Sequence, residues 1–497
     1  MSPNAPNVAA SSQPQAIDLT HMFIPHLRKH QKSPFKAVMG NPTLEMINMA
    51  GGVPNPSTFP LLQIQAKVRT SPSLNSEQDG MLSLEHTQLN GSTESLNELL
   101  QYNDGRGMAS YCRFLRQFTQ TAHSPKYADW DVIASCGNTD SIAKAVSLFC
   151  QQGDHIIVEK YTFPGALSNL EFAKIKPVPV SMDNEGVVPE ALDALCSGWS
   201  GSSPLRAIYL IPTGQNPTGA TMSLERRKAI YATAQKHNLV IIEDDPYYFL
   251  QYGPMQDSTD KPSVADMRKQ LLVPSLLSLD TDGRVIRLDS FSKILAPNLR
   301  CGWITAPQYM LDRLQILNES TILQPSGLTQ GVISRMLNDV WGIKGWIDHL
   351  CTLRADYAAR RNLFVQMARE HLAGMATFTV PTAGMFLWMK IDLGAASADS
   401  TAMPRLLEAM KKCGVMMAPG MPFNVGTDDT ATSVPEYYLR AAFALADTDM
   451  FAPALKRLGQ AIASIRDSVL PDKQSAVHTK PISTTALAAQ ITVNGSN

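Results

Sequence analysis

The chain of 497 residues is long for one domain, and its content of 44% hydrophobic and 18% charged residues is typical of a globular protein with a sizeable core. Its 43 basic and 44 acidic residues give a net charge of −1, which excludes the basic field that favours binding to nucleic acid or to an anionic membrane. We therefore expect two or three lobes and a function that depends on local sites.

Cysteine spacing and hydropathy give two further expectations. The seven cysteines are scattered, odd in number and without a C-x-x-C pair, which argues against a disulfide framework and favours the reducing cytoplasm. No apolar run reaches the roughly 18 residues of a membrane span, so no membrane association is predicted.

The first 105 residues carry few signals of a folded core. Residues 1–30 begin with a Pro-, Ala-, Ser- and Asn-rich stretch, for which we predict a disordered N-terminal tail and no signal peptide. Residues 31–105 are predicted to form an arm and part of a smaller domain. His26 and His30 are four residues apart, but no third ligand accompanies them, so no metal site is predicted.

Residues 106–345 are predicted to form a large domain. Apolar strands at 155–158, 208–211 and 239–242 alternate with helical segments, which is typical of a largely parallel sheet covered by helices. A Gly and small polar residues open the helical pattern near 137–146. The free N–H groups and positive dipole end of such a helix suit a phosphate, which makes Asn138 and Thr139 candidate ligands.

Two later strands of this region end in polar side chains. Residues 208–219 pass from a β-rich run into Asn-Pro-Thr-Gly, which is either an ordinary turn or a turn that presents Asn216. The apolar run 240–242 is followed by carboxylates and a proline, so Asp244 is expected at the carboxyl end of a buried strand, with Tyr247 three residues on.

Lys293 is the most informative residue. It follows a strand and lies among Ser290, Ser292 and Arg300, which together supply an amine for a Schiff base and donors for a phosphate. The candidate cofactor is therefore pyridoxal 5′-phosphate. Asp244 can keep the ring nitrogen of that cofactor protonated, while Asn216 and Tyr247 can reach the ring oxygen.

The C-terminal part returns to mixed α and β content. A long helical region near 346–371 precedes a strand at 385–389 and another near Arg440, so residues 346–472 are predicted to form a smaller α+β domain. Residues 473–497 are rich in Ser, Thr and Ala and are predicted to form a flexible tail.

The ordered motifs at 47–56, 100–102, 133–146, 208–219, 240–247, 290–303, 381–388 and 438–443 resemble those of fold-type I pyridoxal-phosphate enzymes. Within them, the chain is similar to class I/II aminotransferases of the kynurenine/α-aminoadipate and fungal aromatic branch. The resemblance implies an α/β, aspartate aminotransferase-like fold, with a mainly parallel seven-stranded sheet between helices in the large domain and a smaller α+β domain.

The resemblance also implies roles for individual residues. Lys293 would form the Schiff base and then move the proton, and Phe163 would stack on the cofactor ring. Ser290, Ser292, Arg300, Asn138 and Thr139 would hold the phosphate, with Tyr102 reaching it from the neighbouring subunit of a homodimer. Arg440 would bind the substrate α-carboxylate, and Gly52 would let the backbone approach that group.

The expected reaction moves the amino group of an aromatic L-amino acid to 2-oxoglutarate by a ping-pong mechanism, with kynurenine and 2-aminoadipate as further candidate donors. Phe163, Met385, Phe386 and Leu323 are candidates for an apolar substrate wall, although each is also an ordinary core residue. The alternatives are a lyase or decarboxylase of the same fold, in which a different bond lies perpendicular to the ring, a non-catalytic regulator, or a structural relic.

Overall fold

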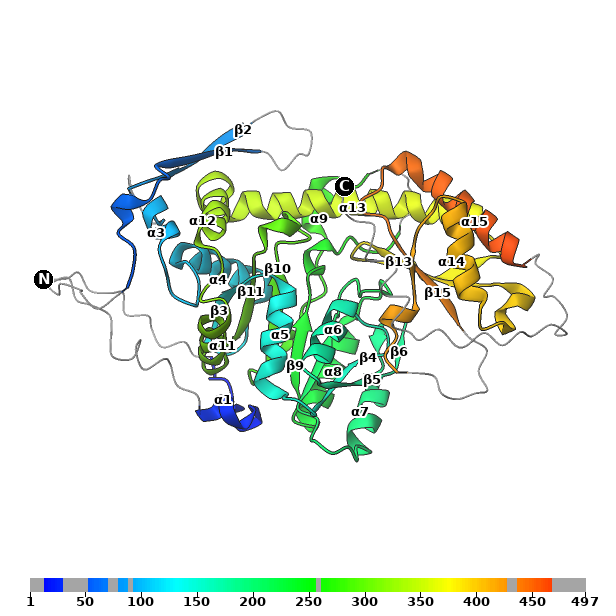
Figure 1. The fold of residues 1–497 in the computed structure, drawn as a ribbon, viewed down its shortest axis with the longest axis horizontal. Coiled ribbons are helices and arrows are strands. Elements are labelled where there is room, and N and C mark those ends of the chain that lie inside the picture. Colours follow the sequence, from blue (N-terminus) through cyan, green and yellow to red (C-terminus); the bar gives the residue numbers. More distant parts are fainter. Residues whose placement is uncertain are drawn as a thin grey trace, which may run out of the picture.

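The computed structural model describes residues 13–29, 52–69, 79–87, 93–255, 261–426 and 436–466. In this part of the chain, a seven-stranded sheet with the spatial order β3-β11-β10-β9-β8-β4-β5 forms the centre of the larger lobe (Figure 1). Only β11 runs antiparallel to its neighbours. The strands are β3 (Trp130–Ser135), β4 (His155–Glu159), β5 (Lys176–Val180), β8 (Ala207–Leu210), β9 (Val240–Asp244), β10 (Val285–Ser290) and β11 (Gly302–Pro307).

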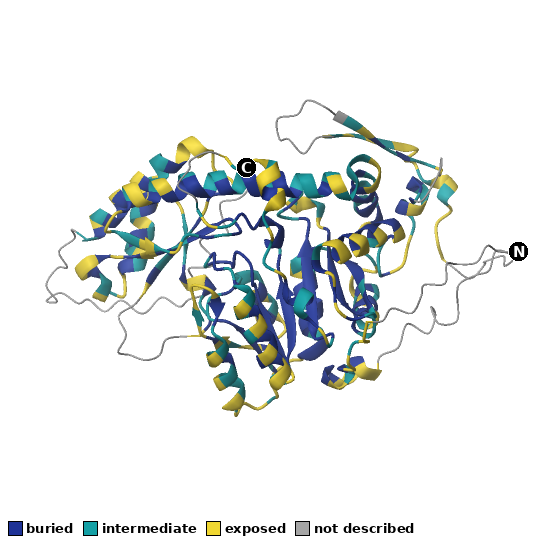
Figure 2. Ribbon diagram, turned by 180° about the vertical axis from the view of Figure 1, so that it is seen from behind, coloured by how far each residue is buried: buried dark blue, intermediate teal, exposed yellow. Residues whose placement is uncertain are grey.

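Helices cover this sheet on both sides. Every residue of β8, β9 and β10 is buried, which is typical of strands between two helical layers, and Figure 2 shows the sheet as the buried centre of the lobe. Helix α5 crosses β3, β9, β10 and β11. The helices of this lobe are α4 (Ala109–His123), α5 (Asn138–Phe149), α6 (Pro164–Phe172), α7 (Pro189–Ser197), α8 (Leu224–Lys236), α10 (Leu276–Leu279), α11 (Gln308–Thr321) and α12 (Gly327–Arg335).

The strand order places the ends of distant segments side by side. After the edge strand β3, the chain crosses to β4 and β5 at the other edge and returns through β8, β9 and β10. The carboxyl ends of these parallel strands therefore meet at one edge of the sheet, where ligands bind in open α/β sheets.

The smaller lobe has a core of its own. Its antiparallel sheet has the order β12-β13-β15-β14, and its apolar cluster includes Phe364, Leu387, Leu439 and Leu458. The elements are β12 (Ala376–Phe378), β13 (Phe386–Ile391), β14 (Ala418–Pro419), β15 (Tyr437–Ala442), α13 (Gly342–His371), α14 (Ala402–Lys412) and α15 (Phe451–Arg466). Helix α13 extends from the larger lobe into the smaller one and also contacts α9 (Val264–Lys269) (Figure 1). The domain limits at 105/106, 345/346 and 472/473 stay predictions.

The segment 13–29, predicted as part of a disordered tail, is folded. It contains a 3₁₀ turn (Thr20–Met22) and the short helix α1 (Pro25–Lys29). Phe23 is fully buried, with its ring centroid 5.6 Å from that of Phe149. The prediction failed here because the apolar partners of this segment come from residues more than a hundred positions away.

The described parts of residues 52–105 also differ from expectation. The hairpin β1 (Gln63–Arg69) and β2 (Asp79–Glu85) and the helix α3 (Leu96–Leu100) pack beside α12. Leu82, Leu84 and Leu99 belong to the apolar cluster of the larger lobe, not to that of the smaller domain. Within the described residues, no helix is both long and apolar enough to cross a membrane.

Candidate active site

A cavity of about 430 Å³ lies at the carboxyl edge of the large sheet, between the two lobes. Residues from β9, β10, the start of α5 and the smaller lobe line it together. Its wall contains Asn138, Thr139, Phe163, Ile211, Asn216, Asp244, Pro246, Tyr247, Ser290, Ser292, Lys293, Pro297, Arg300, Met385, Phe386 and Arg440. The structure thus brings together all the predicted site residues except Tyr102, Gly52 and Leu323.

Asp244, the last residue of β9, supplies a buried carboxylate. Tyr209 Oη donates a hydrogen bond to its Oδ2 (2.7 Å), and Asn138 Nδ2 donates one to its Oδ1 (2.6 Å). Burial raises the pKa of Asp244 to about 6, because water no longer solvates the anion, while the two hydrogen bonds act in the opposite direction.

Two features of this carboxylate were not predicted. The sequence analysis did not predict that Tyr209, on β8, contacts Asp244. The available signal was that Tyr209 is the one residue with a hydroxyl group in the otherwise aliphatic run 208–211. Asn138 was expected to hold a phosphate as part of a helix start with free backbone N–H groups. Its side chain, for which no contact was predicted, donates to Asp244 and to the backbone oxygen of Leu288 (3.1 Å). Because Asn138 is the first residue of α5, its backbone N–H still belongs to the helix start, where N–H groups lack intrahelical partners.

A second group of polar side chains gathers beside that helix start. Ser290 Oγ donates to Ser292 Oγ (2.9 Å), and Arg300 donates to Ser292 Oγ (3.3 Å) and to the backbone oxygen of Cys136 (2.9 Å). Gly137 has φ +89°, a backbone conformation that favours glycine, and a Cβ there would lie 2.7 Å from Arg300 Nη2. Hydroxyls, a guanidinium and a helix N-terminus together form a suitable cradle for a phosphate.

Lys293 is half-buried in the same cavity, three residues after β10 ends. Burial lowers the pKa of its amine, and the positive charges of Arg440 and Arg300 lower it further. A larger fraction of this amine is therefore neutral, and able to act as a nucleophile or base, than of an exposed lysine.

The smaller lobe contributes Arg440, on β15, opposite the turn that carries Asn216. Arg440 Nη1 donates to Asn216 Oδ1 (2.6 Å), and the guanidinium carbon lies 4.3 Å from the centroid of the Phe386 ring. The Nε of Arg440 is buried and has no hydrogen-bond partner among the described residues. Tyr247 meets Phe386 edge-on, at 5.7 Å between ring centroids.

Three predicted residues lie outside the cavity wall. Tyr102 is exposed, with 60% of its surface accessible. Gly52 is also exposed, and a Cβ there would meet no atom within 4 Å, so the expected close approach is not observed within this chain. Leu323, a candidate for the substrate wall, is 39% exposed. His30 lies outside the described residues.

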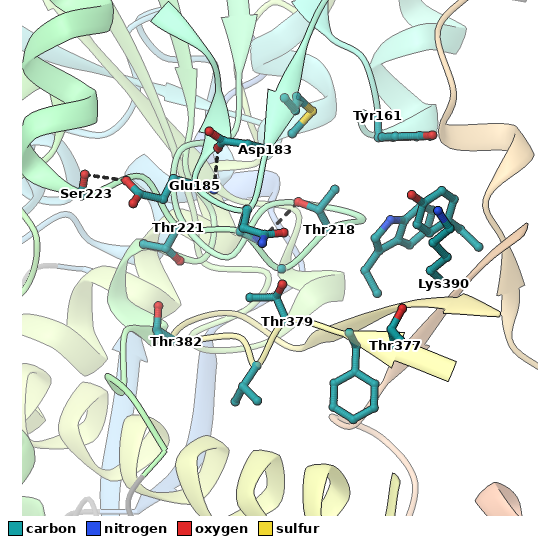
Figure 3. Close-up of a pocket in the computed structure, with 18 residues that line it drawn as sticks. Tyr161, Asp183, Glu185, Thr218, Thr221, Ser223, Thr377, Thr379, Thr382 and Lys390 are labelled. Carbon is teal, nitrogen blue, oxygen red and sulfur yellow. Dashed lines mark hydrogen bonds between the residues drawn. The ribbon is translucent and has the colours of Figure 1, made fainter. Parts of the chain in front are cut away.

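A second cavity, of about 740 Å³, is lined in part by Thr218, two residues after Asn216 (Figure 3). Threonines and aromatic side chains dominate its wall, including Thr218, Thr377 and Trp388. Its lysine, Lys390, is paired with Glu436 (2.5 Å). Although this cavity is larger, the lysine, the buried carboxylate and the phosphate-type cradle line the smaller one, which is therefore the candidate active site.

The chain belongs to the class I and II aminotransferase family, whose family model matches residues 77–458. An aromatic amino acid aminotransferase of Schizosaccharomyces pombe is 35% identical over 89% of this chain and 97% of that protein. An L-tyrosine:2-oxoglutarate aminotransferase of Serpula lacrymans is 35% identical over 76% of this chain and 75% of that protein. The crystal structure of the aminotransferase Aro8 from Candida albicans matches with a TM-score of 0.84 and 32% identity, covering 91% of this chain and 100% of that one.

The cofactor of this family is pyridoxal phosphate, and the residues of the cavity fit it. An amine with lowered pKa, a buried carboxylate and a phosphate-type cradle are all present in one cavity. The buried Nε of Arg440, without a partner in the described residues, is an additional donor for a bound anion.

Proposed function

We propose that the chain transfers the amino group of an aromatic L-amino acid, tyrosine, phenylalanine or tryptophan, to 2-oxoglutarate, forming an aryl 2-oxo acid and L-glutamate. The observation that carries this proposal is the contact between Arg440 and Phe386. A guanidinium suited to an α-carboxylate lies directly on an aromatic wall, to which Met385 and Phe163 add apolar surface. Burying a substrate ring against such a wall favours it by about 2 kcal/mol. The names of the Schizosaccharomyces and Serpula relatives support the same substrate class.

Each residue of the cavity has a separate proposed role. Lys293 would hold the cofactor through its Nζ, and the same amine, when free, would be the acid and base that moves the proton at the substrate Cα. Bound pyridoxal phosphate supplies the electron sink for this transfer. Asp244 would keep the ring nitrogen protonated, while Asn216 and Tyr247 would hold the ring oxygen. Arg440 fixes the α-carboxylate and so aligns the Cα–H bond with Lys293.

The remaining contacts hold the cofactor in place. Ser290, Ser292, Arg300, Thr139 and the backbone N–H of Asn138 bind the phosphate. Phe163, which lines the cavity, would stack on the cofactor ring. A Cβ at Gly165 would lie 2.4 Å from Cζ of Phe163, so the absence of a side chain at Gly165 gives this ring its space.

The active unit is proposed to be a homodimer in the cytoplasm. Tyr102 is exposed and outside the cavity of its own chain, as expected of a residue that reaches the partner's phosphate site. All seven cysteines are free thiols, which suits a reducing compartment. Mixing Tyr102→Phe subunits, expected to bind the cofactor weakly, with inactive Lys293→Ala subunits tests the sharing, because each hybrid dimer would contain one intact site. A mixture no more active than the Tyr102→Phe protein alone contradicts it.

A panel of amino donors with 2-oxoglutarate, ranked by kcat/KM, tests the substrate class. We expect tyrosine, phenylalanine and tryptophan to exceed aspartate, alanine and leucine, with kynurenine and 2-aminoadipate measured beside them. A panel led by an aliphatic or acidic donor would refute the aromatic assignment. Sustained product formation without any 2-oxo acid acceptor would instead indicate the lyase or decarboxylase alternative.

A further inference from the structure

The carboxylate of Asp244 is held from two sides by side chains that take no part in the mechanism above. Tyr209 Oη donates to Oδ2 at 2.7 Å, and Asn138 Nδ2 donates to Oδ1 at 2.6 Å. We propose that Tyr209 and Asn138 are positioning residues that fix the Asp244 carboxylate, in its ionised form, against the ring nitrogen of bound pyridoxal phosphate. The inference rests on the proposed role of Asp244.

The two donors come from elements on opposite sides of Asp244. Tyr209 lies on the adjacent parallel strand β8, where it pairs in register with Ile242, and its long side chain reaches forward to Asp244. Asn138 begins α5, and its Nδ2 also donates to the backbone oxygen of Leu288, the register partner of Asp244 on β10. The carboxylate is thus fixed between the strands β8 and β10 and cannot rotate without breaking a bond on one side.

Each carboxylate oxygen can accept more than one hydrogen bond. With one donor on each oxygen, Asp244 keeps acceptor capacity for a further donor in the cavity, and a ring N–H is such a donor. Tyr209 is 1% exposed, so its hydroxyl is shielded from bulk water. The two hydrogen bonds therefore determine the direction from which the cofactor ring N–H can donate to the carboxylate.

The same bonds decide the charge of the carboxylate. Burial and the nearby Asp289 raise the pKa of Asp244, whereas Tyr209, Asn138 and Arg287 lower it. The pKa of Tyr209 itself is raised by burial, so its hydroxyl keeps its proton and remains a donor. Without these donors, more of the carboxyl group is protonated near neutral pH, and a neutral carboxyl cannot pair with a positively charged ring nitrogen.

The test compares two cofactors on the same apoprotein: pyridoxal phosphate, and its 1-deaza analogue, in which carbon replaces the ring nitrogen. For Tyr209→Phe we expect the Kd of pyridoxal phosphate to rise about tenfold, the loss of one hydrogen bond to a charged group, while the Kd of the analogue changes by less than about twofold. Asn138→Ala is likewise expected to raise the Kd of pyridoxal phosphate more than the Kd of the analogue. Tyr231→Phe is the matched control, since Tyr231 is a buried tyrosine that donates to Asp280 (2.9 Å) in the same lobe, and its Kd for either cofactor should be unchanged.

Equal weakening of both cofactors by Tyr209→Phe would overturn the proposal, because it would indicate a general packing defect. An unchanged affinity for pyridoxal phosphate would also overturn it. Asp244→Asn separates this outcome from failure of the proposed function. If Asp244→Asn does not discriminate between the cofactors, the role of Asp244 itself is wrong; if it discriminates and Tyr209→Phe does not, only the positioning role fails.

Discussion

Arg440→Lys tests the carboxylate site most directly. In the structure, Nη1 of Arg440 donates a hydrogen bond to Asn216 Oδ1 (2.6 Å). The buried Nε has no partner in the described residues and can donate to a substrate oxygen. A lysine keeps the positive charge but cannot hold Asn216 and present a two-point fork at once. Losing one charge-assisted hydrogen bond costs about 2 kcal/mol, which corresponds to a rise in KM of about 30-fold.

The rise should affect the amino acid and the 2-oxo acid alike, because each places its α-carboxylate at the same site in its own half-reaction. Each half-reaction can be followed separately by the absorbance change of the bound cofactor. The control is Arg405→Lys, because Arg405 lies on α14 of the smaller lobe, is paired with Asp399 (3.1 Å) and does not line the cavity. An unchanged KM for both substrates, with normal cofactor binding, would remove Arg440 from the site. A rise for only one substrate would refute the shared carboxylate position.

The remaining predictions concern the amine, a buried acid and the N-terminal segment. Lys293→Ala should lose turnover and covalent attachment of the cofactor, checked by mass spectrometry after borohydride reduction; retained full activity would contradict the assignment. Burial raises the pKa of Glu159 from its ordinary value of 4.5 to about 8 in the folded protein, so its contribution to stability is present below pH 4.5 and is lost as pH rises towards 8. We therefore expect the unfolding free energy of the Glu159→Gln apoprotein to rise relative to that of the parent by up to about 1.4 kcal/mol per pH unit in this window, measured by urea titration. A difference that stays constant with pH would refute this prediction. Phe23→Ala should lower the unfolding free energy by about 3–5 kcal/mol, against little change for the exposed His21→Ala; equal, small effects would show that this segment adds no stability.

Much of the site could be predicted from the sequence because its residues follow local patterns. Asp244 comes at the end of an apolar run, Lys293 follows another, and Asn138 opens a helix after a glycine. Parallel strands have their carboxyl ends at one edge, so strand endings alone place these residues near each other. The same reasoning could not orient a side chain. Asn138 was expected at a phosphate because it opens a helix, but this pattern gives no direction for its side chain, whose amide donates to Asp244 in the structure.

The sequence by itself determined the chemistry that this protein can carry, since the amine, the carboxylate and the arginine are present whatever the fold does with them. Only the tertiary structure decided which groups meet. Arg440 reaches Asn216 across 224 positions of chain, and Tyr209 reaches Asp244 because β8 and β9 are neighbours in the sheet. Such contacts depend on strand order and on the seating of one lobe against the other, and these follow from burying two apolar cores in the whole chain, not from any local pattern.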